Sequence, residues 1–147
     1  MENDSFFYYF GYASNLKVST IEERIGDKIQ DYIQGRLIDY GFRFNRKNSD
    51  GTARANIIAS ESEDVFGVLY QIDQKYRDVL LKTEPGYQLI DITVETEQGN
   101  INAVTFISDA DDEDIYPAGE YLNSILTGAK EHSLPAEYTD FIRSLAK

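Results

Sequence analysis

Residues 6–16 of the chain read Phe-Phe-Tyr-Tyr-Phe-Gly-Tyr-Ala-Ser-Asn-Leu, an aromatic run that breaks into small polar residues. The run Phe6–Tyr12 is short for a buried helix, and aromatic side chains favour strands. We therefore expect a central strand that is closed by Gly11. The small polar residues that follow predict a loop at residues 13–15.

The remainder of the chain alternates strand-type runs with short helical patterns, and no repeat, low-complexity tract or linker interrupts it. The predicted strands are Tyr32–Phe44, Ala55–Ala59, Val65–Ile72, Ile90–Val94 and Ile101–Ile107, and Gln98-Gly99-Asn100 turns the chain between the last two. These patterns predict one α+β domain over residues 1–147.

Helices are predicted from caps and from apolar spacing. Thr20-x-x-Glu23 is a capping box that predicts a helix from Ile21 to about Ile29. Asp73 caps a second helix, which Pro85-Gly86 ends next to Glu84. Two C-terminal helices follow, with inward positions Tyr121, Ile125 and Ala129 in the first and Tyr138, Phe141, Ile142 and Leu145 in the second, which starts at Pro135.

Charge and hydropathy exclude several classes of protein. The chain has 26 Asp and Glu against 14 Lys and Arg, a net charge of −12, which repels a nucleic-acid backbone. The N-terminus lacks the basic start of a secretory signal, and no apolar run is long enough to cross a bilayer. We expect a cytoplasmic protein with neither nucleic acid nor membrane as a partner.

The chain contains no cysteine and a single histidine, His132. Thiolate nucleophiles, disulfides, iron–sulfur clusters and two-histidine metal sites are therefore excluded. His132 lies at a predicted helix end, where a structural role is favoured. A catalytic pair with Ser14 has little support, because the sequence around Ser14 lacks the second glycine of a nucleophile elbow. We expect carboxylates to carry any catalysis.

Two charged clusters also invite a functional interpretation. The acidic stretch Asp109–Asp114 partly follows the spacing of a calcium-binding loop, but Asp114 stands where that loop needs glycine. A solvated loop is the better interpretation. The basic residues Arg43, Arg46, Lys47 and Arg54 surround Asn48-Ser49-Asp50-Gly51 and predict an exposed loop that could recruit an anionic substrate.

Two segments stand out as candidate sites. The end of the aromatic strand, Gly11–Asn15, would expose consecutive backbone N–H groups that can bind a carboxylate or an oxyanion. Glu84 lies at the negative end of a helix, beside Pro85 and Tyr87, and such surroundings suit a carboxyl group to proton transfer. Taken alone, a plain strand end explains the first segment at least as well, and a surface role is the better interpretation of Glu84.

Together and in this order, the segments Tyr9-Phe10-Gly11-Tyr12-Ala13-Ser14-Asn15-Leu16 and Glu84-Pro85-Gly86 resemble the γ-glutamylcyclotransferase family. That family has a Tyr-Phe-x-Tyr-Gly-Ser-Asn-Leu strand end and a glutamate followed by glycine. The resemblance continues through Asp64–Tyr70, Tyr121-Leu122 and Gly128–Tyr138. It implies an α+β fold in which a small mixed sheet curls into a barrel with helices around it. Ala13 replaces the family's usual glycine.

The resemblance also implies a reaction. The free α-amine of a γ-glutamyl amino acid or amide attacks its own side-chain carbonyl, which releases 5-oxoproline and an amine. Because both reacting groups belong to one small molecule, the protein needs no covalent nucleophile, metal or cofactor. The implied proton shuttle is Glu84. The implied substrate-binding residues are Tyr9, Phe10, Gly11, Tyr12, Ala13, Ser14, Asn15 and, more weakly, Tyr121.

Two alternatives stay open at the level of sequence. One is a binding or regulatory module that keeps the pocket without turnover. The other is an enzyme that removes a γ-glutamyl group from a larger biosynthetic intermediate by the same mechanism. Pocket width beyond Glu84 would separate the latter from an enzyme for γ-glutamyl amino acids.

Overall fold

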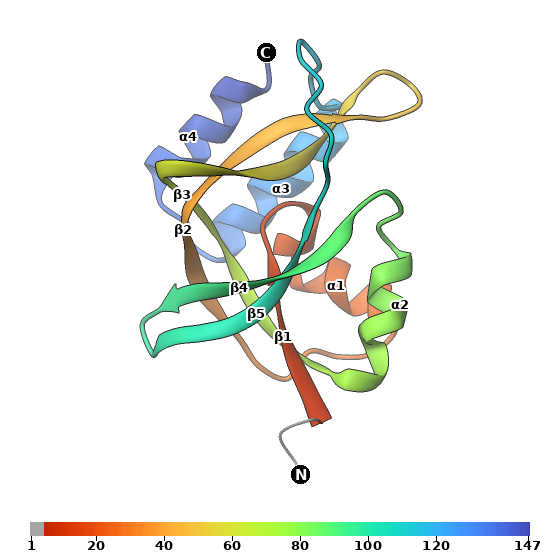
Figure 1. Cartoon of the computed structure of the whole chain (residues 1–147), viewed down its shortest axis with the longest axis vertical. Coiled ribbons are helices and arrows are strands. Elements are labelled where there is room, and N and C mark those ends of the chain that lie inside the picture. Colours follow the sequence, from red (N-terminus) through yellow and green to blue (C-terminus); the bar gives the residue numbers. More distant parts are fainter. Residues whose placement is uncertain (1–4) are drawn as a thin grey trace.

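The structure, a computed structural model, describes residues 5–147 and contains five strands that close into a barrel in the order β1-β3-β2-β4-β5 (Figure 1). The strands are β1 (Phe6–Gly11), β2 (Tyr32–Lys47), β3 (Ala53–Asp73), β4 (Gln88–Thr96) and β5 (Gly99–Ile107). The helices are α1 (Val18–Ile25), α2 (Arg77–Lys82), α3 (Gly119–Glu131) and α4 (Ala136–Leu145), with short 3-10 turns η2 (Ser14–Leu16) and η3 (Gln74–Tyr76). The predicted α+β barrel is confirmed.

Two antiparallel hairpins and one added strand build the barrel. β2 pairs with β3 along most of its length, and β4 pairs with β5 from Gln88↔Ile107 to Thr96↔Gly99. The hairpins meet through the Arg36↔Glu95 pair of β2 and β4. β1 is antiparallel to β3, and its Tyr9 faces Val104 of β5 in a parallel pair, which makes the sheet mixed. The aromatic strand β1 therefore closes the barrel.

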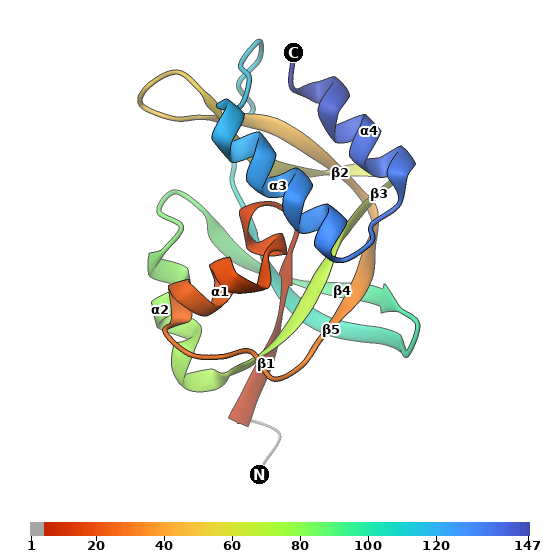
Figure 2. The same ribbon diagram turned by 180° about the vertical axis from the view of Figure 1, so that it is seen from behind.

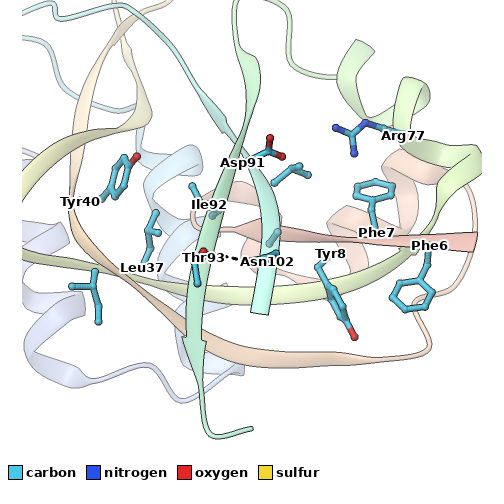
Figure 3. A pocket seen from close by; sticks show the side chains of 13 residues that line it. Phe6, Phe7, Tyr8, Leu37, Tyr40, Arg77, Asp91, Ile92, Thr93 and Asn102 are labelled. Carbon is cyan, nitrogen blue, oxygen red and sulfur yellow. Dashed lines mark hydrogen bonds between the residues drawn. The ribbon is translucent and has the colours of Figure 1, made fainter. Parts of the chain in front are cut away.

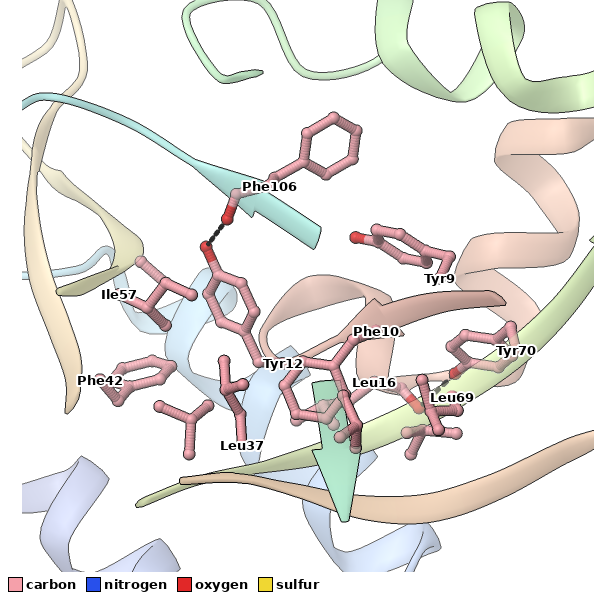
Figure 4. Packing of buried hydrophobic residues seen from close by; sticks show 14 of the residues in the cluster. Tyr9, Phe10, Tyr12, Leu16, Leu37, Phe42, Ile57, Leu69, Tyr70 and Phe106 are labelled. Atoms are coloured by element: carbon pink, nitrogen blue, oxygen red, sulfur yellow. Dashed lines mark hydrogen bonds between the residues drawn. The ribbon is translucent and has the colours of Figure 1, made fainter. Parts of the chain in front are cut away.

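Buried tyrosine hydroxyls fix the core around the end of β1 (Figure 4). The hydroxyl of Tyr12 donates to the carbonyl oxygen of Phe106 at 2.8 Å. The hydroxyl of Tyr70 donates to the carbonyl oxygen of Leu16 at 2.9 Å. Buried polar groups need such partners, so these bonds anchor the loop after β1 to both β5 and β3.

The helices lie on two sides of the barrel (Figure 2). α3 and α4 cover β2 and β3, whereas α1 and α2 lie together near the end of β3. A Cβ added to Gly128 of α3 would lie 2.6 Å from Cβ of Leu16, so glycine permits the close approach of α3 to η2. No helix within residues 5–147 is long and apolar enough to span a membrane.

Several predicted boundaries are wrong for identifiable reasons. Helix α1 begins at Val18, not Ile21, because Glu131 of α3 accepts a hydrogen bond from the Val18 backbone N–H at 3.2 Å. It ends at Gly26, which has a left-handed φ of 76°. The two predicted runs within residues 55–72 form one strand, β3.

The C-terminal helices follow the predicted pattern except at one position. Tyr138 and Ile142 of α4 are buried as expected. Phe141, which was predicted to face inward, is 37% exposed. It lies one residue from Ile142, so the two side chains leave the helix about 100° apart and only one can face the barrel.

Candidate active site

A small cavity of about 30 Å³ lies beside the end of β1, and it brings together residues that are far apart in sequence. Its lining residues are Tyr9, Tyr12, Ala13, Ser14, Asn15, Arg54, Ala55, Glu84, Tyr87, Phe106 and Tyr121. This set includes Glu84 and most of the candidate binding residues from the sequence. Arg54 appeared there only as part of a basic loop, and the contribution of Ala55 was not foreseen.

The loop after β1 forms the first wall of the cavity. The backbone N–H of Leu16 donates to the carbonyl oxygen of Ala13 at 3.0 Å, which shapes the turn η2. Ala13 has a φ of −135°, so this position does not require the left-handed conformation that favours glycine. The Asn15 side chain donates from Nδ2 to the Tyr9 hydroxyl at 2.8 Å.

The oxygen of the Asn15 side chain is unusual. Asn15 Oδ1 is buried and has no hydrogen-bond partner, although the residue is only 3% exposed and lines the cavity. A buried acceptor without a partner costs stability, about 1–3 kcal/mol. Such an atom in a cavity is a candidate ligand-binding group.

Two of the predicted binding residues support the loop from outside the cavity lining. Phe10 is fully buried in the core. A Cβ added to Gly11 would lie 2.7 Å from the backbone oxygen of Asn15, so glycine is needed where the loop folds back over the strand.

Glu84 lies on a tight turn just after α2. Its backbone N–H donates to the carbonyl oxygen of Leu81 at 3.2 Å, and its carbonyl oxygen accepts from the N–H of Tyr87 at 3.1 Å. Gly86 supplies the left-handed φ of 90° that this turn requires. The turn directs the carboxylate inward, and Glu84 is only 5% exposed.

The carboxylate of Glu84 is held by two guanidinium groups. Arg24 of α1 pairs with Oε2, and Arg54 of β3 pairs with Oε1. Arg24 also donates to the hydroxyl of Ser14 at 3.3 Å. Burial opposes the charge on Arg54, but the attraction of the Glu84 carboxylate raises the pKa of its guanidinium overall. Arg54 therefore keeps its positive charge at the cavity.

Two tyrosines form another wall of the cavity, and each is hydrogen-bonded to the backbone of Ala55. The Tyr121 hydroxyl accepts from the Ala55 N–H at 3.0 Å, and the Tyr87 hydroxyl donates to the Ala55 carbonyl oxygen at 2.6 Å. Burial raises the pKa of both phenols and also that of Tyr9. The three hydroxyls therefore stay protonated near neutral pH, and those of Tyr9 and Tyr121 accept the bonds described above, which leaves their protons for a ligand.

The basic residues grouped in the sequence separate in space. Arg46 and Arg54 stack on Tyr87, with guanidinium carbons 5.2 and 5.0 Å from the ring centroid. Arg43 instead forms two hydrogen bonds with Glu63, at 2.9 and 2.7 Å. Only part of the predicted basic cluster therefore faces the cavity.

His132 and the acidic stretch lie apart from the cavity lining. His132 Nε2 lies 2.7 Å from the carbonyl oxygen of Leu16, and its ring packs edge-on against Tyr32. Ser14 accepts from Arg24, so no Ser14–His132 pair forms. The acidic residues 109 and 111–114 are exposed in the connection between β5 and α3. Within residues 5–147, no group of three His, Asp or Glu side chains is placed to hold a metal ion.

A second hollow is much larger and opens on the outside of the barrel (Figure 3). This groove has a volume of about 890 Å³. It is lined by Phe6, Phe7, Tyr8, Leu37, Ile38, Tyr40, Arg77, Asp91, Ile92, Thr93, Asn102, Ala103 and Val104. Neither of its charged residues is buried: Asp91 is exposed, and Arg77 lies over the ring of Phe7, 5.3 Å from its centroid.

Comparison with known proteins gives a consistent family. The family model of the AIG2-like family matches residues 64–142, more than half of the chain. The γ-glutamylcyclotransferase of Bos taurus is 28% identical over 95% of this chain and 78% of its own length. The γ-glutamylcyclotransferase of Homo sapiens is 27% identical over the same shares of the two chains.

Solved structures agree with these sequences. A structure described as a γ-glutamyl cyclotransferase superposes with a TM-score of 0.84 at 27% identity, over 94% of this chain and 86% of that chain. A yeast structure described as a γ-glutamyl cyclotransferase specific to glutathione has a TM-score of 0.72 at 14% identity, over 97% and 94% of the two chains. At that identity the likeness concerns the fold alone.

Proposed function

This chain belongs to the AIG2-like family, and from that premise we propose that it is an enzyme of the γ-glutamylcyclotransferase type. Its substrate would be a γ-glutamyl amino acid or γ-glutamyl amide, and its products 5-oxoproline and a free amine. The named relatives cover nearly the whole chain. The proposal includes a cytoplasmic site of action, as expected from the sequence.

Glu84 would move the proton in this reaction. Its carboxylate accepts a proton from the α-ammonium, and the freed amine attacks the γ-carbonyl carbon to close a five-membered ring. The bond between that carbon and the departing nitrogen then breaks, and Glu84 returns the proton to the departing nitrogen. The ring nitrogen then loses its second proton, through the same carboxylate, to the released amine. The four N-bound hydrogens of the substrate end as one on 5-oxoproline and three on the ammonium product, so the step needs no further reactant.

The remaining cavity groups match the other parts of the substrate. Asn15 Oδ1, the buried acceptor without a partner, would accept a hydrogen bond from the α-ammonium. The Tyr9 and Tyr121 hydroxyls and the loop amides at residues 11–15 would donate to the carbonyl oxygen as it gains negative charge. Tyr12, whose hydroxyl is held by Phe106, would shape the cavity.

One observation carries the proposal: a buried carboxylate and a buried acceptor without a partner line the same small cavity. A primary ammonium group has three N–H donors and can bond to both. The same pairing would orient the amine for an intramolecular attack, and orientation can lower such a barrier by several kcal/mol, on the order of 7 or more in favourable cases.

A panel of γ-glutamyl amino acids and amines tests the proposal through the rate of 5-oxoproline formation. We expect turnover by the wild type and a loss of about a hundredfold or more in kcat for Glu84→Gln, because glutamine cannot accept the proton. Glu63→Gln is the matched control, since Glu63 also pairs with an arginine but lies outside the cavity lining.

Two results would contradict the proposal in different ways. A wild type that forms no 5-oxoproline from the whole panel would remove the enzymatic assignment. Equal rates for the wild type and Glu84→Gln, with circular dichroism showing both folded, would leave the reaction in place and remove Glu84 as its proton shuttle.

A further inference from the structure

The resting position of Arg54 blocks the proposed proton acceptor. Both oxygens of Glu84 are occupied, Oε1 by Arg54 and Oε2 by Arg24, and the Glu84 side chain is only 6% exposed. A carboxylate has about four acceptor sites, but the two guanidinium groups and the burial of Glu84 leave an incoming ammonium little room to reach those that remain. At least one guanidinium has to leave before the substrate can reach Glu84.

The size of the cavity leads to the same requirement. A volume of about 30 Å³ is far below the roughly 300–1,000 Å³ of typical small-molecule sites. An ammonium and a carboxylate on the same carbon need more room than that. Substrate entry therefore requires a side chain of the wall to move.

Arg54 is better placed to move than Arg24. Arg24 is also tied to the Ser14 hydroxyl at 3.3 Å, whereas Arg54 lies on the face of the Tyr87 ring, 5.0 Å from its centroid. A guanidinium can slide over an aromatic face and keep its attraction to the ring. The two side chains are similarly exposed, 24% for Arg54 and 25% for Arg24, so the difference between them lies in their second contacts.

The charges at the cavity favour the binding of a second carboxylate, which can replace Glu84 as the partner of Arg54. Glu84 is the only acidic residue in the lining, and it faces two arginines, so the group has one excess positive charge within a chain of net charge −12. Guanidinium binds carboxylates through paired N–H donors. An entering carboxylate can thus replace Glu84 as the partner of Arg54.

We infer that Arg54 is a specificity-determining residue that leaves Glu84 Oε1 and binds the α-carboxylate of the γ-glutamyl group. The exchange uncovers Oε1 at the moment when the α-ammonium arrives. Binding of the correct headgroup thereby frees the proton acceptor. This inference rests on the proposed function for the identity of the substrate, but carboxylate binding by Arg54 can be tested without turnover.

The kinetic test uses γ-glutamyl-alanine and an analogue in which the α-carboxylate of the γ-glutamyl residue is replaced by a carboxamide. Alanine release is the readout. We expect the wild type to prefer the carboxylate substrate by about tenfold or more in kcat/KM, the scale of a charge-assisted hydrogen bond. Arg54→Gln should lose that preference, mainly through a higher KM for the carboxylate substrate. Arg54→Lys should keep part of it, and Arg43→Gln all of it.

The binding test uses 5-oxoproline and 2-pyrrolidinone, which differ only by the carboxylate, in titration calorimetry. Arg54→Gln should weaken binding of 5-oxoproline about tenfold or more and leave 2-pyrrolidinone unchanged. If Arg54→Gln lowers kcat/KM equally for both substrates and leaves 5-oxoproline binding intact, Arg54 only positions Glu84 and the inference is wrong. If the wild type binds 5-oxoproline through Arg54 but releases no alanine, the proposed function fails and the carboxylate site stands.

Discussion

Two hollows of the barrel differ in what lines them, and the smaller of the two carries the candidate catalytic groups. The groove of Figure 3 has a volume of about 890 Å³, whereas the cavity at Glu84 has about 30 Å³. The groove has no buried charge, while the cavity has a buried carboxylate and an unpaired amide oxygen. Burial strengthens electrostatic interactions, so the contents of a hollow identify a site better than its volume.

After substitution of Glu84, substitution of Asn15 should give the largest difference in activity between the cavity and the groove. Asn15→Leu removes the unpaired acceptor, and we expect kcat/KM to fall by about tenfold to a hundredfold, the scale of a hydrogen bond to a charged group. The melting temperature should change little, because removal of the unpaired oxygen offsets the loss of the Nδ2 hydrogen bond to the Tyr9 hydroxyl. Asn102→Leu in the groove should leave kcat/KM unchanged. Equal losses at both positions would remove the distinction between the hollows.

Tyr12→Phe tests whether a cavity residue acts through shape. The Tyr12 hydroxyl is bound to the Phe106 carbonyl oxygen at 2.8 Å, so its loss should lower the free energy of unfolding by about 1 kcal/mol, measured in urea. The kcat should change less than twofold, since the ring remains. A large fall in kcat with unchanged stability would show that the hydroxyl contacts the substrate instead.

Glu63 is a more exposed glutamate that also pairs with an arginine. Its substitution should affect stability, by less than the effects described above. Hydrogen bonds from Arg43 and Ser60 lower the pKa of Glu63 to about 2. A lowered folded-state pKa adds stability that is complete above the unfolded value, near 4.3, and is lost as the pH falls through about 2.

Glu63→Gln should therefore cost about 0.5 kcal/mol at pH 6, a value reduced for solvent screening because the Glu63 side chain is 31% exposed. The difference from the wild type should vanish near pH 2, as measured by urea unfolding at each pH. A difference that is the same at both pH values would show that the ion pair contributes nothing.

The sequence predicted the fold where the signals were local. The aromatic run became β1, and Asp73 caps the η3–α2 segment by accepting from the Lys75 N–H at 3.0 Å. The start of α1 was missed because its first N–H is bound by Glu131, 113 residues away. No local pattern contains that contact.

The site was predictable only in part, for the same reason. Glu84 and the loop after β1 carry motifs, whereas the pairing of Glu84 with Arg24 and Arg54 depends on three separate elements that the barrel brings together. Arg54 was noticed only as part of a basic cluster, and the geometry divides that cluster between Tyr87 and Glu63. The unpaired oxygen of Asn15 depends on side-chain packing, which the sequence does not record.

Product analysis of one reaction tests the proposed cyclisation without any variant. The wild type is incubated with γ-glutamyl-alanine, and 5-oxoproline, alanine and glutamate are measured together over time. Intramolecular attack by the α-amine predicts 5-oxoproline and alanine in equal amounts, with no glutamate formed. Release of glutamate with alanine would show that water is the nucleophile and would contradict the proposed cyclisation.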